Sequence, residues 1–217
     1  MTYTLTLVAP HPFHDTDVKP LLAGISAHSF TRLGPEAVEL TSDQSLEALQ
    51  GIAAKAQSKG IDANVMRSEG RRKRILISDM DSTIIEQECL DELAILAGCG
   101  DEIIAITERA MRGELNFEEA LTARVAQLKG VPKEMIDEVI SSLTLSPGAK
   151  TLVQTMAAHG AVTALVSGGF TPFTGHIAVK TGFSRHQGNS LEIDDDGVLT
   201  GGLTPPLLGP QAKKDTL

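Results

Sequence analysis

Tryptophan is absent from this 217-residue sequence, tyrosine occurs once and cysteine only twice. Cys89 and Cys99 form no CxxC pair and have no histidine at ligand spacing, which disfavours a zinc site. A reduced pair in the cytoplasm fits better than a disulfide. No apolar run approaches the roughly 18–20 residues that a membrane helix needs, and the N-terminus lacks the basic and long apolar regions of a signal peptide. We therefore expect a cytoplasmic protein with no membrane partner.

Positive charge is also in short supply. The formal net charge is −9, whereas a nucleic-acid-binding protein needs a basic face for the phosphates. The one basic cluster, residues 71–74, is short and is interpreted as a solvated hinge. These features argue against a nucleic-acid partner. A small anionic substrate stays compatible with this charge, because local cations or a bound metal can reverse the local field.

Residues 1–70 alternate strand-like and helix-like segments, which predicts a small α/β domain without a catalytic grouping. Ser45 is the expected N-cap of the second helix and Gly60 its stop. The strand-like runs are Thr4–Val8, Ala37–Leu40 and Ala63–Met66, and the helix-like runs are Val18–His28 and Ser45–Lys59.

A second domain is predicted for residues 71–217, where two short apolar runs suit buried parallel strands. The first, Arg74–Ser78, is followed by the polar loop Asp79–Thr83. The second, Ala161–Val166, is followed by the glycine-rich loop Ser167–Gly169. Open α/β sheets place their sites at the carboxyl ends of their strands. The two loops are therefore expected to meet at one site.

Apolar residues recur at three- and four-residue spacing over about residues 87–145, which predicts a helical cap inserted between the two strands. Ser146 is the expected N-cap of the next helix, with Pro147 at its first position and the helix running to about residue 159. Leu191–Leu199 contains an Asp-Gly turn typical of a hairpin. Its acidic triplet lacks calcium-loop spacing, so a solvated turn is expected there.

Asp79 and Asp81 are the first candidates for chemistry. Two carboxylates this close repel each other unless a cation or a shared proton relieves the repulsion. A hard divalent metal ion does so with oxygen ligands. One aspartate can then attack phosphorus while the other transfers protons. The alternative is that residues 81–83 simply cap the next helix, and an isolated D-x-D would favour that interpretation.

Longer motifs point to a known family. The run I-L-I-S-D-M-D-S-T-I-I-E-Q-E resembles the D-x-D-x-T motif of the haloacid dehalogenase superfamily, and Ser82 and Glu88 narrow the resemblance to phosphoserine phosphatases. M-R-G-E-L-N-F-E-E-A-L-T-A-R-V, residues 111–125, resembles the cap segment of that family. A-L-V-S-G-G-F, residues 164–170, resembles its second motif. The matches come in family order.

The resemblance implies a role for each matched residue. Asp79 is expected to be the nucleophile and a ligand of Mg²⁺. Asp81 is expected to be the general acid and then the base, with its backbone carbonyl on the metal. Ser167 and the amide of Gly168 are expected to hold phosphoryl oxygens, since a hydroxyl and a free N–H can follow the charge of the transition state.

The same resemblance assigns the substrate contacts. Glu88 suits the ammonium group of an amino acid, and Arg124 suits its carboxylate. Phe117 and Met111 are expected to line the apolar side of the closed lid. Considered without the family, each has an ordinary interpretation: a surface glutamate, a solvated arginine and two core residues on helical stripes.

A-K-K-D-T-L near the C-terminus resembles the third motif, in which a lysine balances charge on the nucleophile; Lys213 is the expected residue and Lys214 the fallback. The fourth motif, G-D-G-x-N-D, is absent from the sequence. We therefore expect a fragment of a longer protein, which binds Mg²⁺ poorly and turns over slowly on its own. Equal phosphate release by the fragment and the longer form would contradict this expectation.

The expected fold is a Rossmann-like α/β sheet with a helical cap, preceded by the small domain. The expected function is Mg²⁺-dependent hydrolysis of O-phospho-L-serine through an aspartyl-phosphate, the last step of serine synthesis. A phosphatase for another small phosphate monoester is the first alternative. The second is a regulatory protein whose residues 1–70 form an amino-acid-binding domain of the ACT type, which some family members carry; a homodimer through this domain is compatible with the sequence.

Overall fold

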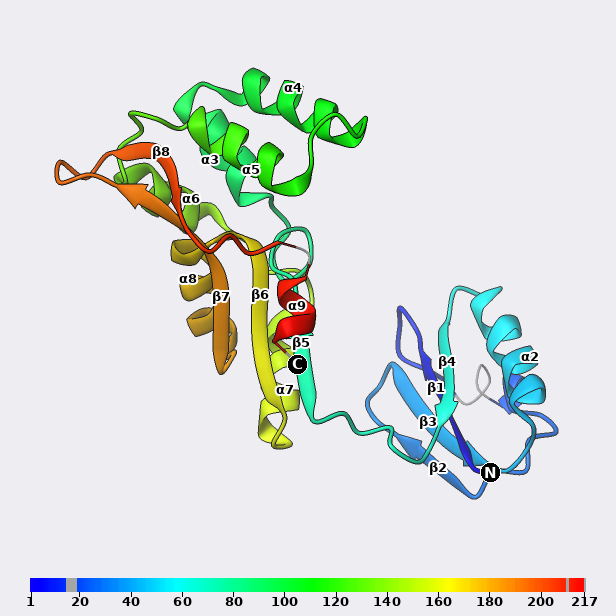
Figure 1. Cartoon of the computed structure of the whole chain (residues 1–217). Helices are drawn as coiled ribbons and strands as arrows, with labels where there is room; N and C mark the ends of the chain where they lie inside the picture. The colour runs from blue at the N-terminus through cyan, green and yellow to red at the C-terminus, as the bar shows by residue number, and fades with distance from the viewer. Residues whose placement is uncertain (15–18, 210, 217) are drawn as a thin grey trace. The chain divides into compact units, whose positions relative to one another are not determined.

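The computed structural model describes residues 1–14, 19–209 and 211–216, and the chain forms two compact units, Met1–Lys73 and Arg74–Leu217 (Figure 1). The boundary expected from the sequence, between residues 70 and 71, is close to this division. Each unit has its own hydrophobic core. Within the described ranges, no helix combines the length and the apolar character needed to cross a membrane.

The first unit is a four-stranded antiparallel sheet with the strand order β2-β3-β1-β4. Alternate side chains of its strands, such as Leu5 and Leu40, are buried because one face of the sheet carries the core. Its elements are β1 (Tyr3–Val8), β2 (Ser29–Arg32), β3 (Ala37–Ser42), α2 (Leu46–Gln57) and β4 (Asp62–Arg67).

Two predictions for this unit meet different outcomes. Ser45 is the N-cap of α2 as predicted, and its hydroxyl accepts a hydrogen bond from the Ala48 amide at 3.2 Å. The helix predicted over Val18–His28 is present at residues 19–21 but does not continue to His28. Residues 19–21 are helical, but the chain then turns at Gly24, whose φ of 87° is left-handed, and leads into the unpredicted strand β2; Val18 lies outside the described residues.

The second unit contains a sheet of order β5-β6-β7-β8, in which β5, β6 and β7 are parallel and β8 is antiparallel. Parallel neighbours need crossover connections, which α7 and α8 supply together with the cap (Figure 1). The predicted Rossmann-like α/β fold is therefore confirmed. The elements are β5 (Ile75–Ser78), α7 (Ala149–Ala158), β6 (Val162–Phe170), α8 (Thr171–Thr181), β7 (Arg185–Ile193), β8 (Leu199–Thr204) and α9 (Ala212–Asp215).

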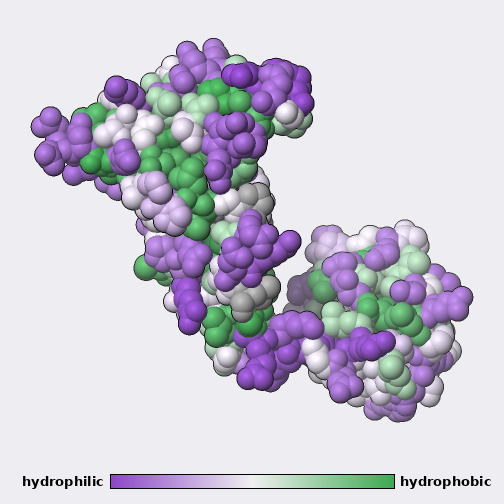
Figure 2. Space-filling view, viewed as in Figure 1, coloured by the Kyte–Doolittle hydropathy of each residue, from purple (hydrophilic) through white to green (hydrophobic). Residues whose placement is uncertain are grey.

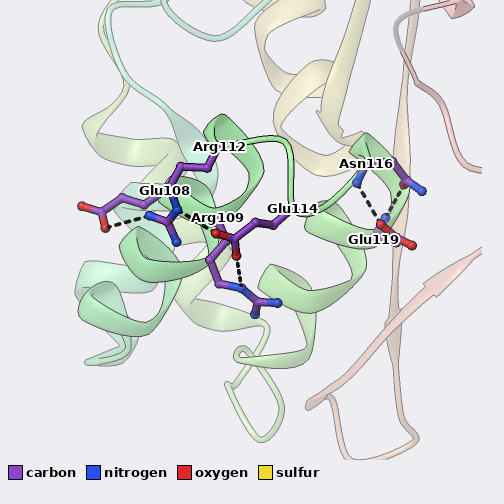
Figure 3. A network of polar contacts seen from close by, with 6 residues as sticks. All are labelled: Glu108, Arg109, Arg112, Glu114, Asn116 and Glu119. Carbon is purple, nitrogen blue, oxygen red and sulfur yellow. Dashed lines mark hydrogen bonds and ion pairs between the residues drawn. The ribbon is translucent and has the colours of Figure 1, made fainter.

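The cap inserted between β5 and α7 is helical, as predicted. In Figure 1 its helices lie at the end of the sheet toward which the carboxyl ends of β5 and β6 point. The start of α5 is fixed by a capping box, in which Asn116 and Glu119 bond each other's backbone amides (Figure 3). The cap helices are α3 (Cys89–Ala97), α4 (Gly100–Met111), α5 (Phe117–Ala126) and α6 (Glu134–Ser142).

The connection between α4 and α5 is held by charge. Glu114 accepts hydrogen bonds from Arg109 and Arg112, at 3.3 and 2.7 Å (Figure 3). These groups are about half exposed, so solvent screens the pairs and each contributes little to stability. Figure 2 shows hydrophilic surface over this part of the cap beside hydrophobic patches. The arginine pairs therefore orient the loop more than they stabilise the cap.

Two boundaries differ from the sequence-based predictions. The helix expected to start at Ser146 begins at Ala149 instead, because Gly148 caps it with a left-handed φ of 82° and Ser146 belongs to the preceding turn. The loop expected at Ser167–Gly169 is the last part of strand β6. The hairpin predicted over Leu191–Leu199 is confirmed, with Gly197 in its turn at a φ of 80°.

Candidate active site

A pocket of about 240 Å³ opens where β5 and β6 end beneath the cap. Its lining combines the acidic loop after β5, the glycine-rich end of β6 and residues from α3 and α5. Seven of the residues predicted for the site lie here. They are Asp79, Asp81, Glu88, Phe117, Arg124, Ser167 and Gly168.

Asp79 directly follows β5, and its carboxylate has a cationic partner. Lys213, on α9, donates from Nζ to Asp79 Oδ2 at 2.5 Å. The other oxygen, Oδ1, accepts from the Met80 amide at 2.9 Å. Of the two lysines considered from the sequence, Lys213 is therefore the one placed beside the expected nucleophile. A cation at this carboxylate offsets the charge that an incoming phosphate would otherwise meet.

Asp81 is held on both of its oxygens. Oδ1 accepts from the Cys89 amide at the start of α3, at 2.9 Å, and Oδ2 accepts from the Ser167 hydroxyl at 3.2 Å. Burial, together with the negative charge of Asp81, raises the pKa of the adjacent Cys89 thiol, so this cysteine stays protonated and is no nucleophile. The hydrogen bond between Asp81 and Ser167 also joins the loop after β5 to the end of β6.

The end of β6 approaches the aspartates closely because it is built from glycine. A Cβ on Gly169 would lie 3.0 Å from Asp81 Oδ2, and one on Gly168 would lie 3.1 Å from the Phe117 ring. The Gly169 amide donates to Ser167 Oγ at 2.9 Å and so fixes that hydroxyl. The backbone can therefore reach a phosphoryl group in the pocket without a side chain in the way.

Glu88, the N-cap residue of α3, and Arg124, on α5, line the pocket. Glu88 Oε1 accepts from the Ser82 hydroxyl at 2.6 Å, and Ser82, with a φ of 48°, is the one non-glycine residue of the described chain whose φ is positive. This backbone conformation is uncommon and is found at functional sites. Met111, predicted to line the closed lid, is 83% exposed at the end of α4 and lies outside this pocket; its role in a closed cap stays a prediction.

The oxygen atoms near Asp79 fit a hard cation. Mg²⁺ is commonly bound through one or two carboxylates, with water and substrate phosphate completing the shell. The Asp79 carboxylate is such a donor, and the backbone carbonyl of Asp81, expected from the family resemblance to be the second ligand, is another oxygen donor. Among the described residues, no cluster of three or more His, Cys, Asp or Glu side chains is arranged as a metal site. The oxygen donors present are thus compatible with part of a site for a hard cation such as Mg²⁺, which stays an expectation from the family resemblance.

Two contributors were missed from the sequence. Cys89 meets Asp81 through its backbone amide, a role for which the residue type gives no signal. Asn189, in β7, bonds the carbonyl of Gly168 at 2.8 Å and is only 1% exposed. Strand β7 is mostly polar and Asn189 is its one buried residue, so no signal in the sequence distinguishes Asn189 from its polar neighbours.

Comparisons with known proteins agree with the fold and with the motifs. Residues 76–217 match the family model described as haloacid dehalogenase-like hydrolase. A curated phosphoserine phosphatase from Archaeoglobus fulgidus is 43% identical over 167 residues, which cover 76% of this chain and 48% of the relative. Another, from Vibrio cholerae, is 43% identical over 66% of this chain and 43% of its own length. The chain thus spans about half the length of these relatives or less.

Solved structures extend the likeness to both units. A HAD family hydrolase from Salmonella enterica serovar Typhi matches 99% of this chain and 76% of its own, with a TM-score of 0.83 and 30% identity. A probable phosphoserine phosphatase from Vibrio cholerae matches 99% and 66%, with a TM-score of 0.79 and 27% identity. The matched family model, the ordered motifs and the shared fold lead to one conclusion: this chain belongs to the haloacid dehalogenase-like hydrolases.

Proposed function

We propose that the protein is a Mg²⁺-dependent phosphatase that hydrolyses O-phospho-L-serine to serine and phosphate. One observation carries the proposal. Asp79 lies at the pocket with Lys213 on one oxygen, while Asp81 is held by Ser167 on the neighbouring strand. This arrangement provides a nucleophile, an adjacent proton-transfer group and phosphate-binding donors within one cavity. The names of the similar proteins favour phosphoserine as the substrate.

In the first step, a carboxylate oxygen of Asp79 attacks phosphorus, and the bond from phosphorus to the serine oxygen breaks. Asp81 donates its proton to the departing serine oxygen, and Asp79 is left as an acyl phosphate. In the second step, Asp81 removes a proton from water as the water oxygen attacks phosphorus. Phosphate leaves and the Asp79 carboxylate is restored.

The remaining residues stabilise and orient. Lys213, the Ser167 hydroxyl and the Gly168 amide offset charge on the equatorial phosphoryl oxygens. The Asp79 carboxylate and the Asp81 carbonyl would hold Mg²⁺, which would supply further charge neutralisation when bound. Arg124 binds the substrate carboxylate and Glu88 the substrate ammonium group. Glu88 keeps Oε2 available for that contact, because Ser82 is bonded to Oε1.

The test is the near-isosteric substitution Asp79→Asn. An amide is a poor nucleophile, so phosphate release from O-phosphoserine should fall about a thousandfold or more. A hydroxylamine-sensitive phosphoenzyme should form on the unmodified protein and be absent from the variant. Circular dichroism checks that the variant is folded. Cleavage of phosphoserine at the normal rate by Asp79→Asn would overturn the proposal.

A second function for residues 1–73 is favoured by the order of elements. The sequence β1, a helical segment at residues 19–21, β2, β3, α2, β4, with the sheet order β2-β3-β1-β4, is the split βαβ arrangement. An amino-acid-binding domain of the ACT type has this arrangement, so we include serine binding by this unit in the proposal. Calorimetric titration of serine into Asp79→Asn protein tests serine binding by this unit. If no heat of binding is measured, the role of the unit would be structural.

The proposal extends to assembly and location. Strand β2 is at an edge of its sheet, and Phe30 on it is 51% exposed, which suits pairing with a second copy of the chain. Light scattering of the protein and of Phe30→Lys measures this association. Cys89 and Cys99 are both free thiols, in keeping with a reducing cytoplasm. The partner that we propose is the small-molecule substrate; the absence of nucleic-acid and membrane partners stays an expectation from the sequence, which has a net charge of −9.

A further inference from the structure

Strands β6 and β7 lose their regular register beside the pocket. Val166 pairs with Gln187, but the next pair is Phe170 with Asn189. The three residues Ser167–Gly169 therefore stand opposite one residue, Gly188. Such a bulge turns the backbone away from the ladder and re-aims side chains, and it is common beside active sites. Here it directs Ser167 toward Asp81.

A bulge leaves main-chain groups in need of other partners. Asn189 provides one: its amide donates from Nδ2 to the Gly168 carbonyl at 2.8 Å. The same amide contacts the backbone of Leu208 twice, since Nδ2 donates to the Leu208 carbonyl at 3.3 Å and Oδ1 accepts from the Leu208 amide at 2.7 Å. Asn189 is 1% exposed, so these bonds are sheltered from water. One side chain thus joins the bulge to the segment around Leu208.

The Leu208 segment leads directly to the lysine of the site. The Gly209 carbonyl accepts from the amide of Ala212, the first residue of α9, at 3.0 Å. Lys213 follows and bonds Asp79. Thr216, just after α9, donates to Gln187 at 3.3 Å. Gln187 is two residues before Asn189 in β7, so this strand holds the segment at two points.

We propose that Asn189 is a positioning residue, which fixes the spacing between the phosphoryl-binding end of β6 and Lys213. The expected effect of Asn189 on catalysis rests on the proposed function, whereas the contacts of Asn189 are independent of that function. A neutral amide suits it, because it donates and accepts at once and adds no negative charge near a phosphate site. A carboxylate at this position could not donate to the two carbonyls, and an apolar residue would leave them unpaired.

The first experiment needs no substrate. Acetic anhydride labels lysine amines, and mass spectrometry gives the rate at Lys213 relative to other lysines. In the unmodified protein this amine is engaged with Asp79 and should react slowly. Asn189→Ala should free the segment and raise the rate at Lys213 severalfold. Thr163→Val is the matched control: Thr163 is buried at the start of β6, the end of that strand away from the pocket, and it bonds Ser184, which precedes β7.

The second experiment measures kcat for O-phosphoserine. Asn189→Ala should lower kcat by roughly tenfold to a hundredfold, since small misplacements at a site have effects of this size. In a Lys213→Ala background the same substitution should cost about threefold or less, because residues that act through one another are not additive. Thr163→Val should leave kcat within about twofold, although it also removes a buried hydrogen bond.

The outcomes separate this inference from the proposed function. Unchanged Lys213 labelling in Asn189→Ala, additive losses in the double variant, or an equal kcat loss in Thr163→Val would each overturn the positioning role. If phosphoserine is not a substrate, the proposed function fails and the labelling still decides the role of Asn189. If Asn189→Ala does not fold, Asn189→Ser takes the place of that variant in both measurements, because the serine hydroxyl can hold a bridging water.

Discussion

Arg124, on α5, and Glu88, the N-cap residue of α3, line the pocket with opposite charges. Under the proposed function, these two residues distinguish an amino-acid phosphate from other phosphoesters. Arg124→Ala should raise KM for O-phosphoserine by roughly tenfold to a hundredfold, the range for losing a hydrogen bond to a charged group. Phosphoethanolamine, which has the ammonium group but no carboxylate, should be affected little. Steady-state kinetics with both substrates make the comparison.

The matched control for Arg124 is Arg109, a cap arginine that bonds Glu114 outside the pocket and is about half exposed. Arg109→Ala should leave KM unchanged for both substrates. An equal penalty of Arg124→Ala on the two substrates would mean that its guanidinium does not recognise the carboxylate. The Nε–H of Arg124 donates to the Ala120 carbonyl at 3.4 Å. This hydrogen bond is long and therefore weak, so breaking it when the substrate binds costs little free energy.

At the scale of the element, the bulge in β6 requires a residue without a side chain at position 188. A Cβ there would lie 3.0 Å from the carbonyl carbon of Phe170 and 3.1 Å from the Gly169 oxygen, both backbone atoms. Gly188→Ala should therefore lower the free energy of unfolding by about 1–3 kcal/mol, the usual cost of overpacking. It should also lower kcat, since relief of the clash moves Ser167. Denaturant unfolding and phosphate release measure the two effects.

Gly175, within α8, offers the comparison. A Cβ on it would meet the His186 ring at 3.4 Å, which is ordinary contact, and alanine favours helices over glycine by about 1 kcal/mol. Gly175→Ala should leave the stability unchanged or raise it and should preserve kcat. A Gly188→Ala protein with normal stability and normal kcat would show that the bulge tolerates a side chain.

How far the sequence predicts these elements depends on where their determinants lie. The strand before Asp79 and the capping of α2 by Ser45 depend on adjacent residues, and both were predicted correctly. The bulge was mistaken for a loop after residue 166, because it arises from pairing with Gly188, some twenty residues further on. The prediction over Val18–His28 rested on helix-like composition, but in residues 19–28 the helix ends at residue 21 and the chain turns at Gly24 before β2 begins.

The same distinction applies to the site. Asp79, Asp81 and Ser167 were found because each belongs to a short motif with its own chemistry. Asn189 was not, since its partners Gly168 and Leu208 come from either side of it in the chain and meet it only after folding. Met111 was expected at the pocket from its place in the cap motif, yet it is exposed in this arrangement of the cap.

At the scale of the whole molecule, the two separate cores predict that truncating a core side chain destabilises only the unit that contains it. Leu40 in β3 is 2% exposed and belongs to the core of the first unit, whereas Leu165 in β6 is fully buried in the second. Leu40→Ala should lower the free energy of unfolding of the first unit by about 2–5 kcal/mol through lost burial and a cavity. Calorimetry should then show one transition shifted and the other unmoved.

Measurements of activity complement the calorimetry, because every residue that lines the pocket belongs to the second unit. Below the shifted transition, kcat for phosphoserine should be the same in Leu40→Ala as in the unmodified protein. Leu165→Ala, a similar truncation on the strand that carries Ser167, should shift the other transition and lower kcat. If Leu40→Ala lowered kcat as much as Leu165→Ala does, catalysis would depend on the core of the first unit, and the two units would not respond separately.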